Sequence, residues 1–297
     1  IIHGYGPEAG EALTQHALVN KITFTGSTAT GRRVMSSAAT GLKRVTLECG
    51  GKSANIILDD AYPDVAVDGA VYAMFYHSGQ CCEAGTRLFL PASRHDELLQ
   101  RLCSRIQDMR LGDPANRNTH LGPLISEAQR DKVLSYIELG QTEGARLVKG
   151  GGIPGDPGLQ QGWFVQPTVF ADVRPDMRIA REEIFGPVLC VFPYRDEEEL
   201  IAMANDSDYG LAGGIWSGHP DRAAALSRHL RTGSVWINDY HLFLVDAPFG
   251  GFGQSGVGRE FGQEGLMEYV ETQTLYTGPE QNPHRQYRMK SLFPPRE

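Results

Sequence analysis

The sequence predicts an α/β protein whose sheets are mostly parallel. Short apolar runs alternate with amphipathic stretches along most of the chain, a pattern typical of parallel strands connected by helices. The chain has 297 residues, which is enough for a large core and two domains. Hydrophobic residues make up 41% and charged residues 22%, as in an ordinary globular protein.

Each predicted element follows from its local pattern. Short apolar runs predict strands over residues 21–25, 44–47, 55–58, 86–90, 164–170, 188–192, 212–216 and 234–237. Amphipathic stretches predict helices over residues 28–39, 64–76, 94–109, 126–142, 197–205 and 220–230. Ser126 and Gln129 have the spacing of a capping box at the start of the fourth helix. Glycine and proline predict a loop over residues 150–162.

Charge and cysteine content argue against several functional classes. The net charge is −8 and there is no basic stripe, so we expect no nucleic-acid partner. No apolar run approaches the roughly 18–20 residues that cross a bilayer, so we expect no membrane partner. Five scattered cysteines favour a reducing, cytoplasmic location over a disulfide framework, and no spacing suggests a metal site. Because the chain begins at Ile1 without Met, we expect it to start inside a longer protein.

The segment Gly79–Cys82 holds the first candidate for chemistry. It lies between a predicted helix that ends near Tyr76 and a predicted strand that begins at Thr86. A cysteine at such a junction can be partly exposed, near backbone N–H groups that favour the thiolate that a nucleophile needs. The alternative is that Cys82 packs as a small buried hydrophobic residue, as free cysteines often do.

Two strand ends are candidates for a base and for an anion site. Glu48 ends an apolar strand and precedes two glycines, where partial burial would suit it to general-base chemistry. The alternative is a surface Glu48 paired with Lys52. Gly26 and Ser27 form a turn between a strand and a helix N-terminus, which favours an anion such as phosphate. The alternative is that Ser27 serves only as the helix N-cap.

A fourth candidate segment precedes a Gly-Pro turn. Glu183 and Phe185 lie two residues apart, so that the carboxylate could bind a ribose diol while the aromatic ring packs on a second ring. The alternative is a helix end with one buried Phe, which is the commoner arrangement.

Together these segments, in this order, resemble the aldehyde dehydrogenase family. Phe75–Cys82 resembles the family pattern F-x-N-x-G-Q-x-C, and Leu47–Lys52 resembles L-E-L-G-G-K. Phe24–Ser27 matches F-T-G-S, Glu183–Pro187 matches E-I-F-G-P, and Pro248–Glu260 resembles P-F-G-G-x-x-x-S-G-x-G-R-E. The resemblance spans nearly the whole chain and corresponds to the C-terminal part of the family's sequence.

The resemblance implies NAD(P)-dependent oxidation of an aldehyde to a carboxylic acid. Cys82 would attack the aldehyde to form a thiohemiacetal, and hydride transfer to the nicotinamide would leave a thioester. Glu48 would act as the general base that activates the water for thioester hydrolysis. Cys81 occupies a variable position of the family pattern and would be a neighbour of the nucleophile.

The resemblance also implies the residues that would contact the coenzyme, either NAD or NADP. Gly26 and Ser27 would lie at the pyrophosphate, Glu183 at the nicotinamide ribose with Phe185 beside it, and Cys49 near the nicotinamide. Three positions depart from the family pattern without removing a reacting group: His77 replaces an Asn, Cys49 replaces a Leu and Ala54 replaces a Pro.

The implied architecture has three parts. Residues 1–50 would be the C-terminal part of a Rossmann-like coenzyme-binding domain, and residues 51–254 the catalytic domain. Residues 255–297 would return to the coenzyme domain and carry an oligomerisation strand within Val270–Thr277, in a homodimer or homotetramer. The family's second oxyanion donor and its adenine-ribose lysine would precede residue 1.

Within the family, the closest resemblance is to members that oxidise betaine aldehyde and amino aldehydes. It is carried by Val235–His241 and Ala247–Gly251. Tyr240 and Phe249 would offer aromatic faces to a quaternary ammonium group. The alternative is a general apolar tunnel for uncharged aldehydes. Two other interpretations stay open for the whole chain, namely a truncated, inactive fragment and a non-catalytic scaffold on the same fold.

Overall fold

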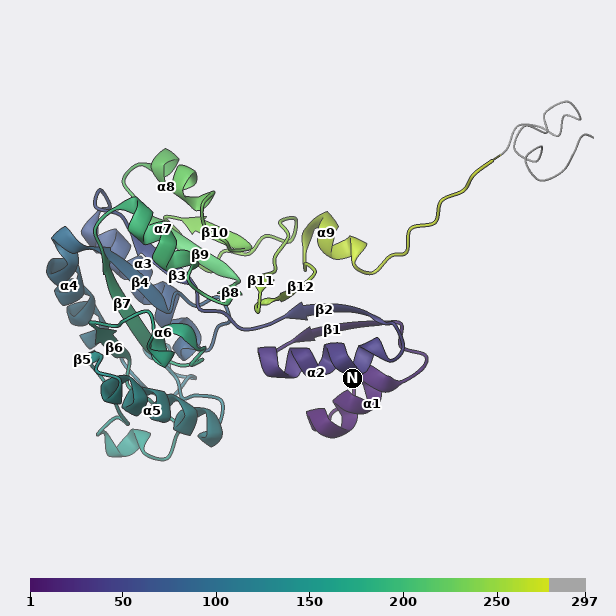
Figure 1. Ribbon diagram of the computed structural model, residues 1–297. Helices are drawn as coiled ribbons and strands as arrows, with labels where there is room; N and C mark the ends of the chain where they lie inside the picture. Colours follow the sequence, from purple (N-terminus) through teal and green to yellow (C-terminus); the bar gives the residue numbers. More distant parts are fainter. Residues whose placement is uncertain (278–297) are drawn as a thin grey trace, which may run out of the picture.

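The computed structural model describes residues 1–277, whose strands form sheets of seven, three and two strands. Figure 1 shows a large body around the seven-stranded sheet and a smaller body around the three-stranded sheet. The observed architecture confirms the predicted α/β class, because parallel strands alternate with helices in the larger sheet.

The smaller body consists of a three-stranded sheet and two helices. The sheet has the order β1 (Lys21–Thr25), β2 (Arg44–Glu48) and β12 (Gly256–Val257), and the helices are α1 (Glu11–Gln15) and α2 (Thr28–Ala39). β1 and β2 are parallel, with Thr25 beside Glu48, whereas β12 runs antiparallel to β2. The carboxyl ends of β1 and β2 therefore meet at the edge that faces the larger body (Figure 1).

The larger body is built on seven strands in the order β10-β9-β3-β4-β7-β6-β5. All pairs are parallel except β5 with β6. The bounds are β3 (Ala54–Ile57), β4 (Arg87–Pro91), β5 (Arg146–Lys149), β6 (Thr168–Ala171), β7 (Val188–Tyr194), β9 (Ala212–Trp216) and β10 (Ser234–Ile237).

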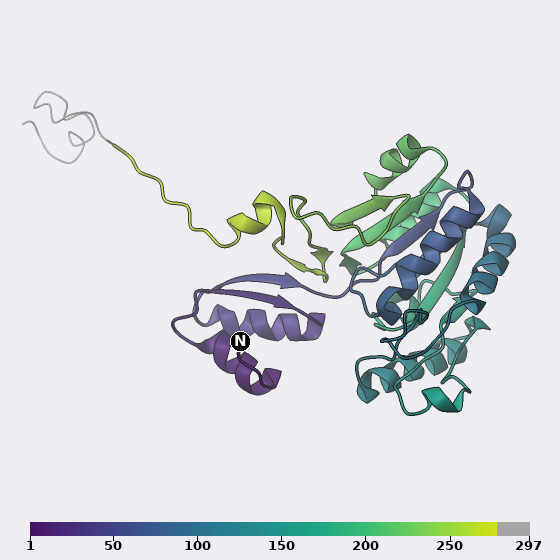
Figure 2. The same cartoon turned by 180° about the vertical axis from the view of Figure 1, so that it is seen from behind.

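Helices cover both faces of this sheet, as Figures 1 and 2 show from opposite sides. One face packs on α3 (Pro63–Phe75) and α4 (His95–Gln107). The other packs on α5 (Glu127–Thr142), α6 (Arg178–Arg181), α7 (Glu197–Asn205) and α8 (Pro220–Ser227). Neighbouring residues of β3 point to opposite cores, Ile56 to the second face and Ile57 to the first, so the strand is buried on both sides.

The chain returns to the smaller body after β10. β11 (Phe252–Gly253) pairs with β8 (Tyr209–Gly210) of the larger body, β12 then joins β2, and α9 (Gly262–Met267) follows. Residues 270–277 form no strand within the described chain: Arg44 on β2 contacts Val270 and Glu271, and the segment after them extends away from both bodies (Figure 1). The oligomerisation strand stays a prediction, and residues 278–297 lie outside the described residues. The domain boundaries at residues 50 and 254 also stay predictions.

Most long elements match their predicted positions. The bounds of β1, α2, β9 and β10 are those predicted, and the loop over residues 150–162 contains only one 3₁₀ turn, at Pro157–Leu159. β6 begins at Thr168, later than the predicted residue 164, because the chain reaches the sheet only after Pro167. The sequence analysis missed α1, α6, α9 and the strands β5, β8, β11 and β12.

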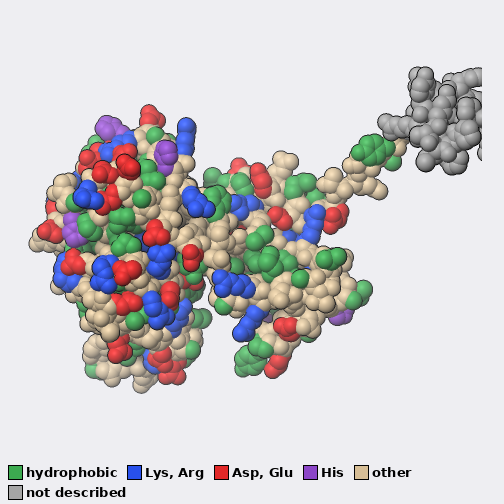
Figure 3. All heavy atoms as spheres, viewed as in Figure 1, with side chains coloured by type: hydrophobic (Ala, Val, Ile, Leu, Met, Phe, Trp, Pro, Cys, Tyr) green, Lys and Arg blue, Asp and Glu red, His purple; other side chains and the backbone are tan. Residues whose placement is uncertain are grey.

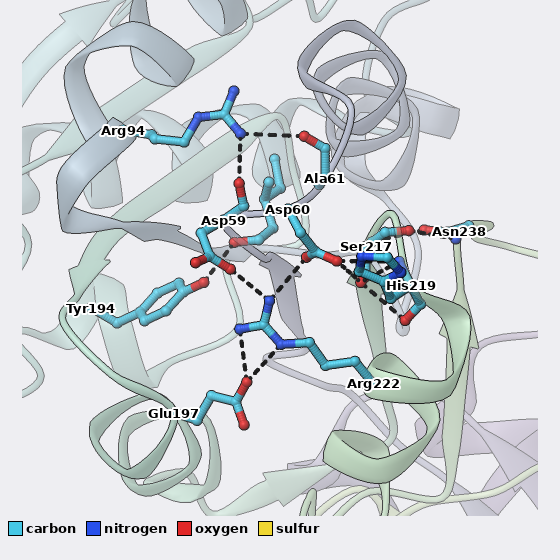
Figure 4. Close-up of polar contacts among 11 residues, drawn as sticks. Asp59, Asp60, Ala61, Arg94, Tyr194, Glu197, Ser217, His219, Arg222 and Asn238 are labelled. Carbon is cyan, nitrogen blue, oxygen red and sulfur yellow. Dashed lines mark hydrogen bonds and ion pairs between the residues drawn. The ribbon is translucent and has the colours of Figure 1, made fainter.

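A polar cluster ties the end of β3 to the helices of the larger body (Figure 4). Arg222 on α8 pairs with Asp59 at 2.6 Å, with Asp60 at 3.2 Å and with Glu197 on α7 at 2.8 Å. Because most of these groups are partly exposed, the cluster serves mainly to orient α7 and α8. Figure 3 shows charges of both signs intermixed over the visible face of this body.

Candidate active site

The loop after β2 brings the candidate segments together. A Cβ atom on Gly50 would overlap the Glu183 carboxylate, and one on Gly51 would overlap the backbone carbonyl of Cys82. The Gly51 N–H donates to Glu183 Oε1 at 3.1 Å. Two successive glycines therefore let the end of the Glu48 strand pack directly against both the Cys82 turn and the Glu183 segment.

The turn before Cys82 has a strained backbone. His77, Ser78 and Gly79 have φ angles of 49°, 57° and 72°, in the left-handed region that residues other than glycine rarely adopt. The Ser78 hydroxyl donates to the carbonyl of Gly122 at 2.9 Å. This bond helps to hold the turn in place, so that Cys82 is fixed between α3 and β4.

Cys82 is half-buried, and its thiol donates to Glu83 Oε2 at 3.1 Å. Burial raises the pKa of Cys82, and the Glu83 carboxylate raises it further. The prediction that the backbone here favours a thiolate is therefore wrong for the resting site, because the neighbouring carboxylate stabilises the neutral thiol. Cys81 also stays a thiol, since burial and then Glu83 raise its pKa to about 12.

Glu48 is a buried carboxyl group with a raised pKa. It is 3% exposed, and neither carboxyl oxygen has a hydrogen-bond partner within residues 1–277. Burial and then the charge of Glu260 raise its pKa to about 8, against the opposing charge of Arg259. A carboxyl group that titrates near neutral pH has the property that general-base chemistry requires.

The position of Glu48 rules out the alternative of a surface carboxylate paired with Lys52. Lys52 does not pair with it, because the Lys52 ammonium donates to the carbonyl of Glu182 at 2.8 Å. The Glu48 side chain instead lies beside Gly250, where an added Cβ would lie 2.8 Å from Glu48 Oε1. Among the described residues no hydrogen bond joins Glu48 to Cys82.

The residues predicted to bind the coenzyme pyrophosphate lie at the start of α2. Ser27 caps this helix, because its hydroxyl accepts from the Thr30 N–H at 3.3 Å. Gly26 is exposed, and its N–H donates to the carbonyl of Glu48 at 3.0 Å. Capping does not close the site, since the helix N-terminus stays exposed beside the strand ends, as an anion site requires. Cys49 is buried, with its sulfur facing α2.

The Glu183 segment is held from two sides. Glu183 accepts from Gly51 as described, and burial raises its pKa. Phe185 is half-buried and adopts a left-handed φ of 60°. The Gln129 side chain donates to the Phe185 carbonyl at 2.7 Å. The predicted capping box is thus half correct: the Ser126 hydroxyl accepts from the Gln129 N–H at 3.2 Å, but the Gln129 side chain supports the site segment.

The two residues predicted to contact substrate differ in exposure. Tyr240 is 2% exposed, and its hydroxyl donates to the backbone carbonyl of Glu83 at 2.8 Å. The structure therefore places its ring in the core behind the Cys82 turn and does not offer the ring to a cavity. Phe249 is half-buried, with its ring 5.0 Å from that of Phe243.

The sequence analysis missed two polar residues at the site, Glu83 and His241. Glu83 Oε1 lies 2.9 Å from His241 Nδ1, and the two side chains are 8% and 3% exposed. The carboxylate directly after Cys82 was a signal in the sequence, because it changes the acidity of the thiol. His241 gave no such signal, because it lies 158 residues from Glu83 along the chain.

Within residues 1–277, no group of three or more His, Cys, Asp or Glu side chains is placed to hold a metal ion. In the same range, no helix combines the length and the apolar character needed to cross a bilayer.

Comparison with known proteins agrees with this geometry. The aldehyde dehydrogenase family matches residues 1–275. The chain is 48% identical over 276 residues to a betaine aldehyde dehydrogenase of Brucella melitensis, covering 93% of this chain and 56% of that protein. The chain thus spans just over half the length of the curated relatives that it matches.

Solved structures give the same result. A betaine aldehyde dehydrogenase of Staphylococcus aureus in complex with NAD⁺ matches with a TM-score of 0.89 and 42% identity, over 90% of this chain and 53% of that one. An aldehyde dehydrogenase of Bacillus cereus in complex with NAD⁺ matches with a TM-score of 0.87 and 46% identity, over 90% and 54%. The chain belongs to the aldehyde dehydrogenase family.

Proposed function

We propose that the protein carrying this chain oxidises an aldehyde to a carboxylic acid with NAD or NADP, with Cys82 as nucleophile and Glu48 as general base. The observation that carries the proposal is the Gly50–Gly51 loop, which packs the Glu48 strand end against the Cys82 turn and Glu183. Family membership supports the same reaction.

The chemistry follows from the reactivity of a thiol and a buried carboxyl group. After losing its proton, Cys82 attacks the aldehyde carbon to form a thiohemiacetal, and loss of hydride leaves a thioester on the sulfur. The backbone N–H of Cys82 is a candidate donor to the oxyanion, and such a donor contributes about 3–4 kcal/mol. Glu48, once ionised, removes a proton from the water that hydrolyses the thioester.

The residues present fit a dinucleotide. The exposed N-terminus of α2, with Gly26 and Ser27, would hold the pyrophosphate, and Glu183 with Phe185 would hold the nicotinamide ribose. Glu183 suits this role because its Oε1 is fixed by the Gly51 N–H. Cys49 would lie beside the ring through its backbone, because its buried sulfur faces α2. When bound, the coenzyme supplies the hydride acceptor.

The test of this proposal is the Cys82→Ala variant of the full-length protein. It should lose aldehyde-dependent NAD(P)H formation and esterase turnover, whereas Cys81→Ala, the matched control on the neighbouring thiol, should retain both. Loss of activity in the Cys81 variant with retention in the Cys82 variant would overturn the assignment.

For the substrate we propose betaine aldehyde or an amino aldehyde. The Brucella and Staphylococcus relatives are named as betaine aldehyde dehydrogenases. An aromatic group of Tyr72, Tyr76, Trp236 and Phe243 surrounds His241 and Phe249, with ring centroids 5.0–6.5 Å apart in the pairs that link it. Tyr72, Tyr76 and Phe243 expose aromatic rings of the kind that bind quaternary ammonium groups, whereas Trp236 and Tyr240 are too buried to contribute.

The substrate assignment is tested by comparing kcat/KM for betaine aldehyde and for an uncharged aldehyde of similar size. Each cation–π contact of about 0.5–2 kcal/mol would raise the ratio by roughly twofold to thirtyfold in favour of the cation. Equal values would support the general apolar tunnel.

We further propose that the complete protein is a cytoplasmic homodimer or homotetramer. Sedimentation of the full-length protein tests the oligomeric state.

A further inference from the structure

The proposed reaction uses Cys82 but neither of its hydrogen-bonded neighbours, Glu83 and His241. The Cys82 thiol donates to Glu83 Oε2 at 3.1 Å, and Glu83 Oε1 lies 2.9 Å from His241 Nδ1. His241 Nε2 lies 3.2 Å from the carbonyl oxygen of Ala73 at the end of α3. The three side chains thus form one continuous chain of hydrogen bonds that ends on a backbone acceptor.

The last bond fixes the protons of this cluster. The Ala73 carbonyl can only accept, so His241 Nε2 must carry a hydrogen. His241 Nδ1 then shares a second proton with Glu83, which lies on Nδ1 in an imidazolium–carboxylate pair or on Oε1 in a neutral pair. In both arrangements Glu83 Oε2 keeps a lone pair that accepts from the Cys82 thiol.

Aromatic rings pack around the His241 side chain. The ring centroids of Tyr72, Tyr76 and Tyr240 lie 5.3, 5.1 and 4.9 Å from that of His241, and its side chain is 3% exposed, so its position beside Glu83 is fixed. Burial alone raises the pKa of Glu83, but the hydrogen bonds from His241 and Cys82 outweigh burial and leave the pKa below its ordinary value. The other titratable groups that face the cluster are Cys81, Tyr72, Tyr76, Glu183, Asp239 and Tyr240.

We propose that Glu83 is the base that takes the Cys82 proton, and that His241 is a positioning residue that supports Glu83. The Sγ–H bond breaks, an Oε2–H bond forms, and the electron pair stays on the sulfur. The proton that His241 Nδ1 shares with Oε1 lies on Nδ1 after the transfer, so the product is a neutral Glu83 carboxyl group between the thiolate and the doubly protonated His241 ring. No proton enters or leaves the cluster.

This assignment separates the two bases of the reaction. Glu48 has no hydrogen bond to Cys82 and lies beside Gly250, whereas Glu83 contacts the reacting sulfur directly. Glu83 would therefore serve the attack of the thiol, and Glu48 the later hydrolysis. The inference rests on the proposed function only in that Cys82 is the nucleophile.

The test is the rate at which iodoacetamide alkylates Cys82 in the full chain between pH 6 and 9, followed by mass spectrometry of the Cys82 peptide. At pH 7, Glu83→Gln should slow this alkylation by about tenfold or more, because the amide cannot accept the proton. Glu83→Asp should restore part of the rate. Glu199→Gln removes a partly exposed carboxylate on α7 that pairs with Arg195, and as the matched control it should leave the rate unchanged.

An unchanged or faster alkylation rate in Glu83→Gln would overturn the proposal. If Glu83 only stabilised the neutral thiol, its removal would make the thiolate easier to form and alkylation faster. Cys190, which is 0% exposed in the folded chain, reports folding in the same digest. If Glu83→Gln exposes Cys190 to alkylation, the histidine variants decide: His241→Asn, which keeps an N–H donor, should retain more of the rate than His241→Ala, and equal rates would overturn the role of His241. Because alkylation needs neither aldehyde nor coenzyme, failure here is distinct from failure of the Cys82→Ala activity test.

Discussion

The buried carboxyl group of Glu48 should make the stability of the folded chain depend on pH. Its pKa is raised from 4.5 to about 8 in the folded state. Below pH 4.5 both states hold the proton, and above pH 8 both have released it. Between these values the unfolded state releases the proton while the folded state keeps it, so stability falls as the pH rises.

The size of this effect follows from the shift. Each pH unit within the window costs about 1.4 kcal/mol, so at pH 7 the cost approaches about 3 kcal/mol as an upper limit. Glu48→Gln removes the titration and keeps a neutral side chain of similar shape. In a protein of this size, about 1 kcal/mol changes the melting temperature by roughly 2–4 °C. The variant should therefore melt several degrees above the wild type at pH 7 and level with it at pH 4.5.

The assay is thermal unfolding of the wild type and Glu48→Gln in steps from pH 4.5 to pH 9. The difference in melting temperature should grow through the window and become constant above pH 8. Glu138→Gln on α5, which removes an exposed carboxylate, is the control for a general change of net charge. A difference in melting temperature between wild type and Glu48→Gln that stays constant from pH 4.5 to pH 9 would refute the raised pKa.

Two further outcomes follow from the same geometry. Ser255 is fully buried, and its hydroxyl donates to the Gly50 carbonyl at 2.7 Å and accepts from the Gly210 N–H at 3.0 Å. Ser255→Ala should therefore lower the free energy of unfolding, measured by urea denaturation, by about 1–3 kcal/mol. A loss below about 0.5 kcal/mol would contradict this. Because the chain spans just over half the length of its relatives, a purified polypeptide of residues 1–297 should form no NADH with an aldehyde, and turnover at the rate of a full-length relative would contradict this.

Local patterns predicted the elements that local physics determines. The bounds of α2 follow from Ser27, which caps the helix, and β9 follows from an apolar run that the sheet buries completely. β1 and β10 follow from short runs in which one residue each, Ile22 and Trp236, is buried. β8, β11 and β12 contain two residues each and exist only because distant segments pair, such as Gly256 with Glu48. No local pattern can predict a strand of that kind.

The candidate site shows the same division. The glycines after Glu48 were visible in the sequence, and the structure gives their reason as close contact with the Cys82 turn and Glu183. The resting state of Cys82 was not predictable from backbone placement, because it depends on burial and on Glu83. The burial of Tyr240 was equally unpredictable, because the sequence of a loop does not show whether a tyrosine ring faces solvent or packs in the core.

The central claim is that Cys82 carries the covalent intermediate, and trapping that intermediate tests it most directly. In the full-length Glu48→Gln variant, hydrolysis should be slowed by about 10²–10⁴-fold, so the thioester should accumulate with aldehyde and coenzyme. After acid quenching, mass spectrometry should find the acyl group on Cys82. An acyl group on Cys81, or no acylated cysteine while NAD(P)H forms, would contradict the account.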